Sequence, residues 1–109
     1  MTKNESIWKS SYAQQLAEVL TTIDSKDTME RFLRDVMTEK EILEMSARLE
    51  AARMLSIGEK YTAITATTKL SSRTIARISD WIQNGKGGYK AALQIIASHH
   101  DHLPPAHAE

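Results

Sequence analysis

The sequence predicts an all-α fold, and two features of the chain support this prediction. Apolar residues recur at steps of three and four through most of the 109 residues, and no segment alternates apolar with polar residues as a strand does. Helix-capping residues precede several of these segments, and glycine follows two of them. We expect about six helices in a single domain at residues 1–98, followed by an exposed tail at residues 99–109.

The first helix is expected at about residues 6–22, and the second begins with a capping box. The apolar face of the first helix consists of Trp8, Tyr12, Leu16, Val19, Leu20 and Ile23. Asp27 and Glu30 form the capping box, in which each side chain accepts a hydrogen bond from the other residue's amide. The apolar face of the second helix consists of Met29, Phe32, Leu33, Val36 and Met37.

A third helix is expected between Thr38 and Gly58. Thr38 and Glu41 repeat the capping-box pattern at its start. The predicted apolar face consists of Ile42, Met45, Leu49, Ala52 and Leu55. Gly58 is expected to end the helix, because glycine tolerates the left-handed backbone that often follows a helix.

Residues 61–84 carry the pattern of a helix-turn-helix, with helices expected at about 62–68 and 72–84. The apolar contacts between the two helices are expected at Ile64, Leu70, Ile75 and Ile78. Ser71 stands at the N-cap of the second helix. Lys69 stands where glycine often relaxes the turn, and Thr65 stands where a smaller alanine is usual. Three glycines within residues 85–88 separate the motif from a last short helix that contains Tyr89 and Leu93.

A helix-turn-helix places its second helix in the major groove of DNA. Arg73 is the expected base-reading residue, because arginine bound to guanine is the commonest specific contact. Ser72 and Thr74 are expected to contact bases or phosphates, and Arg77 to reach phosphate or pack at the helix edge. Ser71 can join them, although its capping role competes. The further candidates for phosphate contact are Lys60, Thr62, Lys69 and Lys86.

The distribution of charge along the chain supports DNA binding, although the net charge does not. The whole chain has a net charge of zero, but residues 58–90 hold six lysines and arginines against two acidic residues, a local charge of +4. Phosphate binding depends on the local positive potential. A helical module that binds other proteins without DNA is the alternative, and it accounts for the neutral total.

Other classes of protein lack a supporting pattern. The sequence has no nucleophile–base constellation, no phosphate-binding glycine loop after a strand and no paired carboxylates, so we expect no enzyme. With no cysteine, disulfides and thiolate metal sites are excluded. Adventitious metal binding is the most we expect of the histidine-rich tail, which contains His99, His100, Asp101, His102 and His107. No apolar run is long enough to cross a membrane and the N-terminus lacks a signal-peptide pattern, so a cytoplasmic protein is expected.

The stretch at residues 36–93 resembles the Trp-repressor superfamily, in particular its Trp-repressor-like YerC/YecD branch. Three segments show the resemblance: Arg-Leu-Glu-Ala-Ala-Arg-Met-Leu at 48–55, Ser-Ser-Arg-Thr-Ile-Ala-Arg-Ile at 71–78 and Gly-Lys-Gly-Gly-Tyr-Lys-Ala-Ala-Leu at 85–93. The resemblance implies a homodimer in which the N-terminal helices of the two subunits interlock. It also implies that the protein regulates transcription by binding double-stranded DNA, with repression as the expected mode.

The resemblance also raises the question of a ligand, since classical Trp repressors bind tryptophan between two arginines. Arg48 and Arg77 match these arginines, and Thr38 matches a threonine that lines the same pocket. However, Ile78 and Trp81 add bulk where the ligand needs clearance. We therefore expect that the protein does not use tryptophan as a corepressor.

Two structural roles are expected for residues of this pocket, and one charge argues against the ligand. Arg48 is expected to pair with Glu44, four residues earlier on the same helix. Trp81 is expected to pack beside Ile78 and Ile82 on the buried face. Asp80 adds a negative charge near the position of a ligand carboxylate, which is unfavourable.

Overall fold

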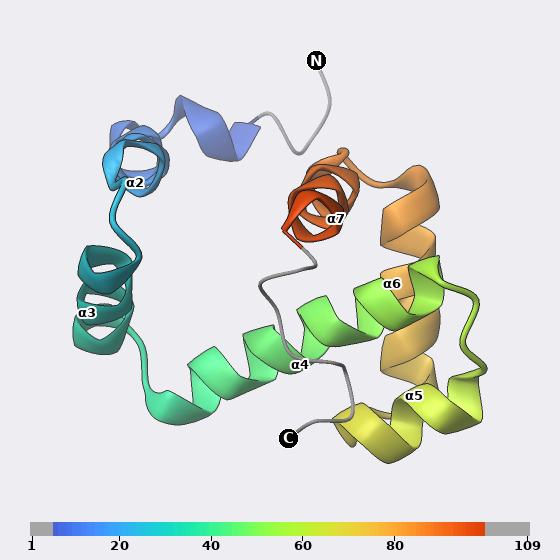
Figure 1. Ribbon diagram of the computed structural model, residues 1–109. Coiled ribbons are helices and arrows are strands. Elements are labelled where there is room, and N and C mark those ends of the chain that lie inside the picture. The colour runs from blue at the N-terminus through green and yellow to red at the C-terminus, as the bar shows by residue number, and fades with distance from the viewer. Residues whose placement is uncertain (1–5, 100–109) are drawn as a thin grey trace. The chain divides into compact units, whose positions relative to one another are not determined.

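The computed structural model describes residues 6–99 of the chain. Over this range it contains six α-helices, one short 3-10 helix and no strand, which confirms the all-α prediction (Figure 1). The elements are η1 (Ile7–Lys9), α2 (Ser11–Thr22), α3 (Lys26–Val36), α4 (Glu39–Ser56), α5 (Tyr61–Thr68), α6 (Ser72–Asn84) and α7 (Gly88–Ser98). The chain divides between Glu39 and Lys40 into two compact units, which are described separately.

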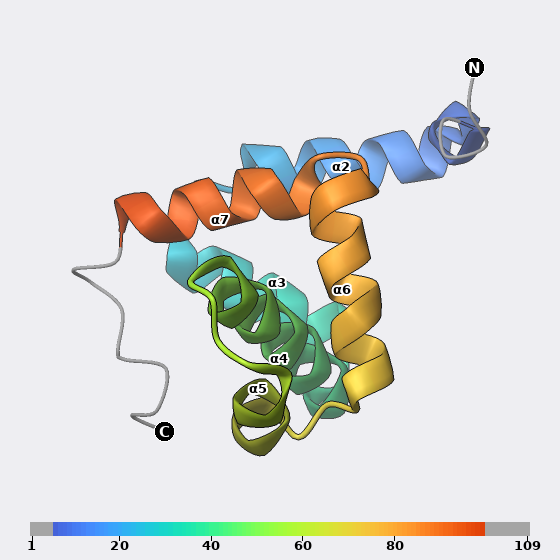
Figure 2. The same ribbon diagram turned by 90° about the vertical axis from the view of Figure 1, so that its right-hand side faces the viewer.

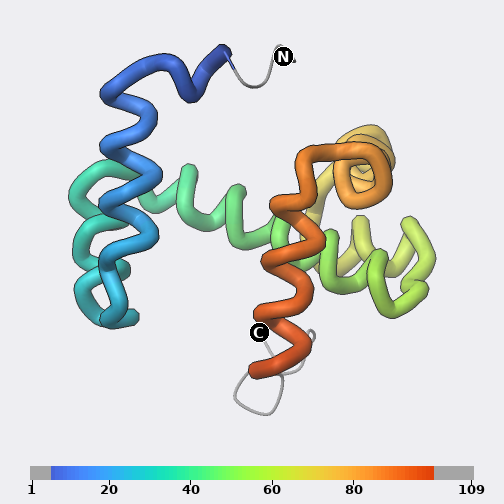
Figure 3. The backbone as a smooth tube through the Cα atoms, turned by 90° about the horizontal axis from the view of Figure 1, so that it is seen from above, coloured from blue at the N-terminus to red at the C-terminus, as the bar shows by residue number. Residues whose placement is uncertain are grey.

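In the first unit, the single helix expected at residues 6–22 is interrupted at Ser10. The 3-10 helix η1 ends at Lys9, and the chain bends before α2 begins at Ser11 (Figure 3). Ser10 has an extended backbone, and its hydroxyl accepts a hydrogen bond from the Ala13 amide at 3.3 Å. This N-cap in the middle of the expected helix explains the break.

The start of α3 also differs from the prediction. Ser25, rather than Asp27, is the N-cap, and its hydroxyl accepts a hydrogen bond from the Thr28 amide at 3.2 Å. Asp27 lies in the first turn of the helix, where its carboxylate forms an ion pair with Arg31. An acidic residue in this turn favours the positive end of the helix dipole, so Asp27 stabilises the helix start without capping it.

The core of the second unit is formed by α4, α5 and α6, with α7 beside it (Figure 2). The buried side chains belong to Ala51, Ala52, Met54, Ile64, Ile75 and Ile78. Leu55, Leu70, Ile82, Tyr89 and Leu93 are partly buried against them. All the buried positions of α4 lie in its C-terminal half. The apolar face predicted for this helix is therefore not covered along its whole length, since Met45 is 63% exposed and Leu49 is 38% exposed.

The end of α4 is fixed by Gly58, as predicted. Its backbone is left-handed with a φ of 87°. The Gly58 amide donates to the Leu55 carbonyl at 3.1 Å, and the Glu59 amide donates to the Met54 carbonyl at 3.0 Å. These two bonds form a Schellman motif, which satisfies carbonyls that the helix end would otherwise leave without partners. The motif turns the chain toward α5.

No helix in the described part of the chain is both long enough and apolar enough to cross a membrane.

Candidate nucleic-acid interface

The turn between α5 and α6 has the geometry that a helix-turn-helix requires. Helix α5 ends at Thr68, and Lys69 adopts a left-handed backbone with φ 65° and ψ 11°. The Lys69 amide donates to the Thr65 carbonyl at 2.9 Å. Thr68 bridges the turn: its hydroxyl donates to the Ile64 carbonyl at 2.7 Å and accepts from the Leu70 amide at 3.3 Å. The lysine therefore itself adopts the left-handed conformation for which glycine is usual.

Helix α6 begins and ends where the sequence predicts, at Ser72 and Asn84. Ser71 is its N-cap: the Thr74 amide donates to the Ser71 hydroxyl at 3.1 Å. The same hydroxyl donates to the Thr74 side chain at 3.1 Å. The side chain of Ser71 is thus already engaged in holding the helix start.

Three isoleucines fix the rotation of α6 about its axis. Ile64 of α5 and Ile75 and Ile78 of α6 are fully buried, as predicted, and Leu70 packs against them. Because these side chains hold one face of α6 against the core, the opposite face is turned to solvent. Ser72, Arg73, Ala76, Arg77 and Asp80 are all exposed there.

The predicted DNA-contacting residues are accessible, with one exception. Thr74 is half-buried. The exposed ones are Lys60 at the N-cap of α5, Thr62 within α5, Lys69 in the turn, Ser71, Ser72, Arg73, Arg77, and Lys86 before α7. The structure therefore brings a cluster of cations and hydroxyls to the surface around α5, the turn and α6.

Among the described residues, most cations of α3 and α4 are paired with carboxylates, with Arg34 and Arg48 as exceptions, whereas four cations of this region are not. Elsewhere in residues 6–99, carboxylates neutralise Lys26, Arg31, Lys40 and Arg53. The hydrogen bonding of the Arg53 guanidinium to the Glu50 carboxylate, which accepts, also raises the pKa of Arg53. By contrast, no ion pair within the described residues involves Lys60, Lys69, Arg73 or Arg77. Their charges are available to an anionic partner.

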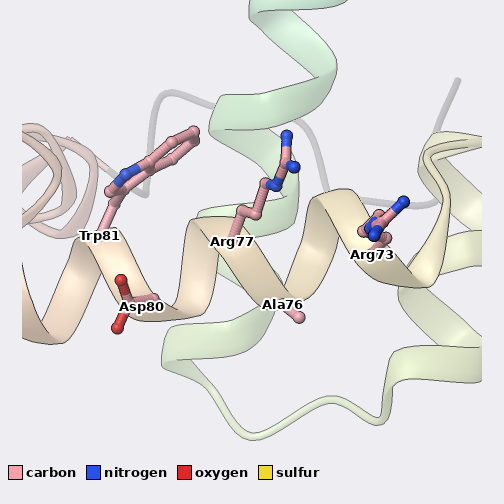
Figure 4. Close-up of a pocket in the computed structure, with 5 residues that line it drawn as sticks. All are labelled: Arg73, Ala76, Arg77, Asp80 and Trp81. Carbon is pink, nitrogen blue, oxygen red and sulfur yellow. The ribbon is translucent and has the colours of Figure 1, made fainter.

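A shallow pocket of about 480 Å³ lies along α6. It is lined by Arg73, Ala76, Arg77, Asp80 and Trp81 (Figure 4). Arg77 and Trp81 project from the same side of the helix, whereas Asp80 points to another side. The Asp80 carboxylate accepts a hydrogen bond from the Asn84 side chain at 2.9 Å. Arg73, Arg77 and Trp81 follow one another at intervals of four residues, and this spacing places side chains on the same face of a helix.

One expectation about this pocket is wrong. Trp81 does not pack on the buried face, because it is 44% exposed and lines the pocket. Ile78 is fully buried in the core and does not line the pocket, so its expected effect on a tryptophan site stays a prediction. The physical reason is helical phase, since Trp81 lies one turn after Arg77, while Ile82 lies one turn after Ile78 and follows it toward the core.

Of the three residues matched to a tryptophan site, only Arg77 lines this pocket. Arg48 is half-buried on α4, and Thr38 directly precedes that helix. The expected pairing of Arg48 with Glu44 is wrong, because the Glu44 carboxylate lies 4.0 Å from the Lys40 ammonium and Arg48 has no ion pair in the described range. Glu44 is equally four residues from both cations, so spacing alone does not decide between them.

Metal binding has no arrangement to support it between residues 6 and 99. Within this range, no group of three histidine, cysteine or acidic residues is placed to hold a metal ion. His99 is exposed at the end of α7. The other residues of the histidine-rich tail, His100, Asp101, His102 and His107, lie outside the described residues.

Comparison with known proteins gives three kinds of match. Residues 11–96 match the Trp repressor protein family. The uncharacterized protein YerC of Bacillus subtilis is 34% identical over 82 residues, which are 75% of this chain and 79% of YerC. This match agrees with the resemblance seen in the sequence.

Solved structures share the fold. A candidate Trp repressor from Staphylococcus aureus superposes with a TM-score of 0.79 at 24% identity, covering 88% of this chain and 96% of the other. A TrpR-like protein from Eubacterium eligens superposes with a TM-score of 0.78 at 29% identity, covering 84% and 95%.

Proposed function

Because this chain belongs to the Trp repressor family, we propose that it is a sequence-specific regulator of transcription that binds double-stranded DNA in the cytoplasm as a homodimer. Repression is the mode that the family favours. The family is a regulator fold and not an enzyme class. Helix α6 is the proposed reading helix.

One observation supports DNA binding most directly. Arg73 and Arg77 are exposed on α6, outside any ion pair in the described residues. An unpaired cation binds phosphate without first giving up a protein carboxylate. Arg73 lies in the first turn of α6, the part of a reading helix that contacts base edges. We assign base reading to Arg73, with Ser72 and Thr74 beside it.

The other cations suit phosphate contacts, which position the protein without specifying sequence. Lys60 and Lys69 lie at the two ends of α5, and Arg77 lies one turn beyond Arg73. Thr62, Ser71 and Lys86 complete the proposed contact surface. Ser71 is the least free of these side chains, because its hydroxyl caps α6.

The apolar surface of the N-terminal unit supports the homodimer. Trp8, Tyr12, Leu16 and Val19 are all exposed, and none of η1, α2 or α3 contains a buried residue. Burial of each large side chain contributes roughly 1.5–3 kcal/mol. We propose that these side chains are buried against the second subunit.

The test of DNA binding is the salt dependence of affinity for duplex DNA. Neutralising phosphates releases counterions, so affinity falls steeply as salt increases. Fluorescence anisotropy at several salt concentrations measures this slope. If no duplex binds at low salt, the helical protein-binding module becomes the better explanation.

The test of sequence reading is Arg73→Ala. Selection from a random-sequence DNA pool is expected to show relaxed preference at one base pair per half-site, with a loss of ~1–3 kcal/mol. Arg31→Ala is the matched control, since that arginine lies on α3 and is paired with Asp27. An unchanged preferred sequence for Arg73→Ala removes Arg73 from base reading.

A further inference from the structure

Lys69 is the one non-glycine residue with a positive φ in residues 6–99. The other two positive-φ positions in that range are Gly58 and Gly87. A Cβ added at either glycine would meet no atom within 4 Å, so glycine serves the backbone conformation there and not a need for space. The chain thus uses glycine for this conformation at two turns but lysine in the helix-turn-helix, although a left-handed backbone is costly for a residue with a Cβ.

The turn itself does not require a lysine. Its conformation is held by backbone and neighbouring groups: the Lys69 amide donates to the Thr65 carbonyl, and the Thr68 hydroxyl bridges the Ile64 carbonyl and the Leu70 amide. Glycine would make the same amide hydrogen bond without the Cβ penalty. The reason for a lysine must therefore lie in its side chain.

Packing does not supply that reason. The Lys69 side chain is exposed and belongs neither to the buried core nor to the residues packed against it. An intramolecular ion pair does not supply it either, because none within the described residues involves Lys69. What remains is a positive charge at the junction of α5 and α6, two residues before the N-cap Ser71.

We propose that Lys69 is a phosphate-anchoring residue and that the chain gives up stability in the turn to keep its ammonium there. This inference rests on the proposed DNA-binding function. It differs from a simple contact assignment, because it predicts that stability and affinity change in opposite directions when Lys69 is replaced by glycine.

The experiment compares Lys69→Gly, Lys69→Asn and Lys69→Arg with the unchanged chain. Thermal unfolding gives Tm, and fluorescence anisotropy with a mixed-sequence duplex gives affinity as a function of salt. Lys69→Gly should raise Tm by roughly 2–5 °C, because the left-handed strain is relieved. It should weaken binding about fivefold and lower the salt slope by about one per helix-turn-helix.

The other variants separate the effect of the left-handed backbone from the effect of the side-chain charge. Lys69→Asn should fall between glycine and lysine in Tm, since asparagine tolerates the left-handed region better than most residues, and should lose as much affinity as Lys69→Gly. Lys69→Arg should keep both the Tm and the salt slope. Lys60→Ala is the matched control: its φ of −75° is ordinary, so its loss should not bring the gain in Tm that strain relief gives Lys69→Gly.

Two results would overturn the inference. One is a Lys69→Gly variant that binds with the salt slope of the unchanged chain, and the other is a Lys69→Gly variant with a lower Tm. If the unchanged chain itself shows no salt-dependent binding, the proposed function fails and the inference with it. Steep salt dependence of the unchanged chain together with an unaltered Lys69→Gly slope rejects the inference alone.

Discussion

Ser71 determines where α6 begins, through its two hydrogen bonds with Thr74. Because an alanine at this position would leave the Thr74 amide without its side-chain acceptor, Ser71→Ala is expected to lower the free energy of unfolding by ~1 kcal/mol. Urea denaturation measures the change. Ser72→Ala is the control, since Ser72 is exposed at the first position of the helix and no hydrogen bond of its side chain holds the turn.

A Ser71→Ala variant as stable as the unchanged chain would show that the N-terminal turn of α6 is held by the isoleucine core alone. The expected loss is measurable because α6 carries two of the buried isoleucines, so a frayed first turn weakens the packing of Ile75.

Residue spacing predicts the core of the helix-turn-helix well but assigns its flanks less reliably. Ile64, Ile75 and Ile78 are buried as predicted, because large aliphatic side chains at this spacing have no favourable place in solvent. Trp81 was assigned to the same face, yet it is exposed. An indole is both apolar and able to lie at a surface, so its type does not reveal its side of the helix. The position of Trp81 four residues after the exposed Arg77 indicates its side of the helix better than its residue type does.

At the scale of helices, ends defined by one strong signal are predicted and ends with several candidates are not. Gly58 ends α4 with the left-handed backbone expected of it, and α6 has its predicted bounds. Residues 25–28 offer Ser25, Asp27 and Thr28, all good N-caps, and the structure uses Ser25. Sequence alone does not rank such neighbours, because the energies of the alternative caps differ by less than tertiary packing contributes.

The proposed homodimer would cover the exposed apolar side chains of α2. Leu16→Glu is expected to raise the dimer dissociation constant at least about tenfold, because the variant places a charge where burial of each leucine contributes roughly 1.5–3 kcal/mol. Sedimentation equilibrium over a range of protein concentrations gives the constant. Gln15→Glu introduces the same charge at the neighbouring exposed position and should leave dimerisation nearly unchanged.

A Leu16→Glu protein that stays as dimeric as the Gln15→Glu control would mean that α2 lies outside the subunit interface. Equal weakening by both variants would point to a general effect of negative charge on this helix. Only a weakening of dimerisation that is confined to Leu16→Glu supports the interlocking of subunits through the apolar face of α2.

At the scale of the whole molecule, the charges of a neutral chain are unevenly distributed. Acidic residues neutralise four of the six cations on α3 and α4, while Lys60, Lys69, Arg73 and Arg77 stay outside ion pairs in the described residues. The local charge of +4 in residues 58–90 was visible in the sequence. The sequence does not show which cations are paired. Pairing depends on rotamers and on competition between cations, such as that of Lys40 and Arg48 for Glu44.

The surroundings of Arg77 support the prediction that the protein does not use tryptophan as a corepressor. The chain's own indole, Trp81, already lies beside Arg77 in the pocket on α6, and the Asp80 carboxylate lines the same surface. A tryptophan ligand in this pocket would have to displace the Trp81 indole. Its carboxylate would also lie near the Asp80 carboxylate, which is electrostatically unfavourable.

Titration calorimetry with L-tryptophan is therefore expected to show no saturable binding at micromolar concentrations, and added L-tryptophan should not change the affinity for duplex DNA. Trp81→Ser is the informative partner variant, since it clears the pocket while leaving Arg77 and the core intact. Micromolar binding by the unchanged chain would contradict the prediction. Binding gained only by Trp81→Ser would identify the chain's own indole as the group that keeps the ligand out.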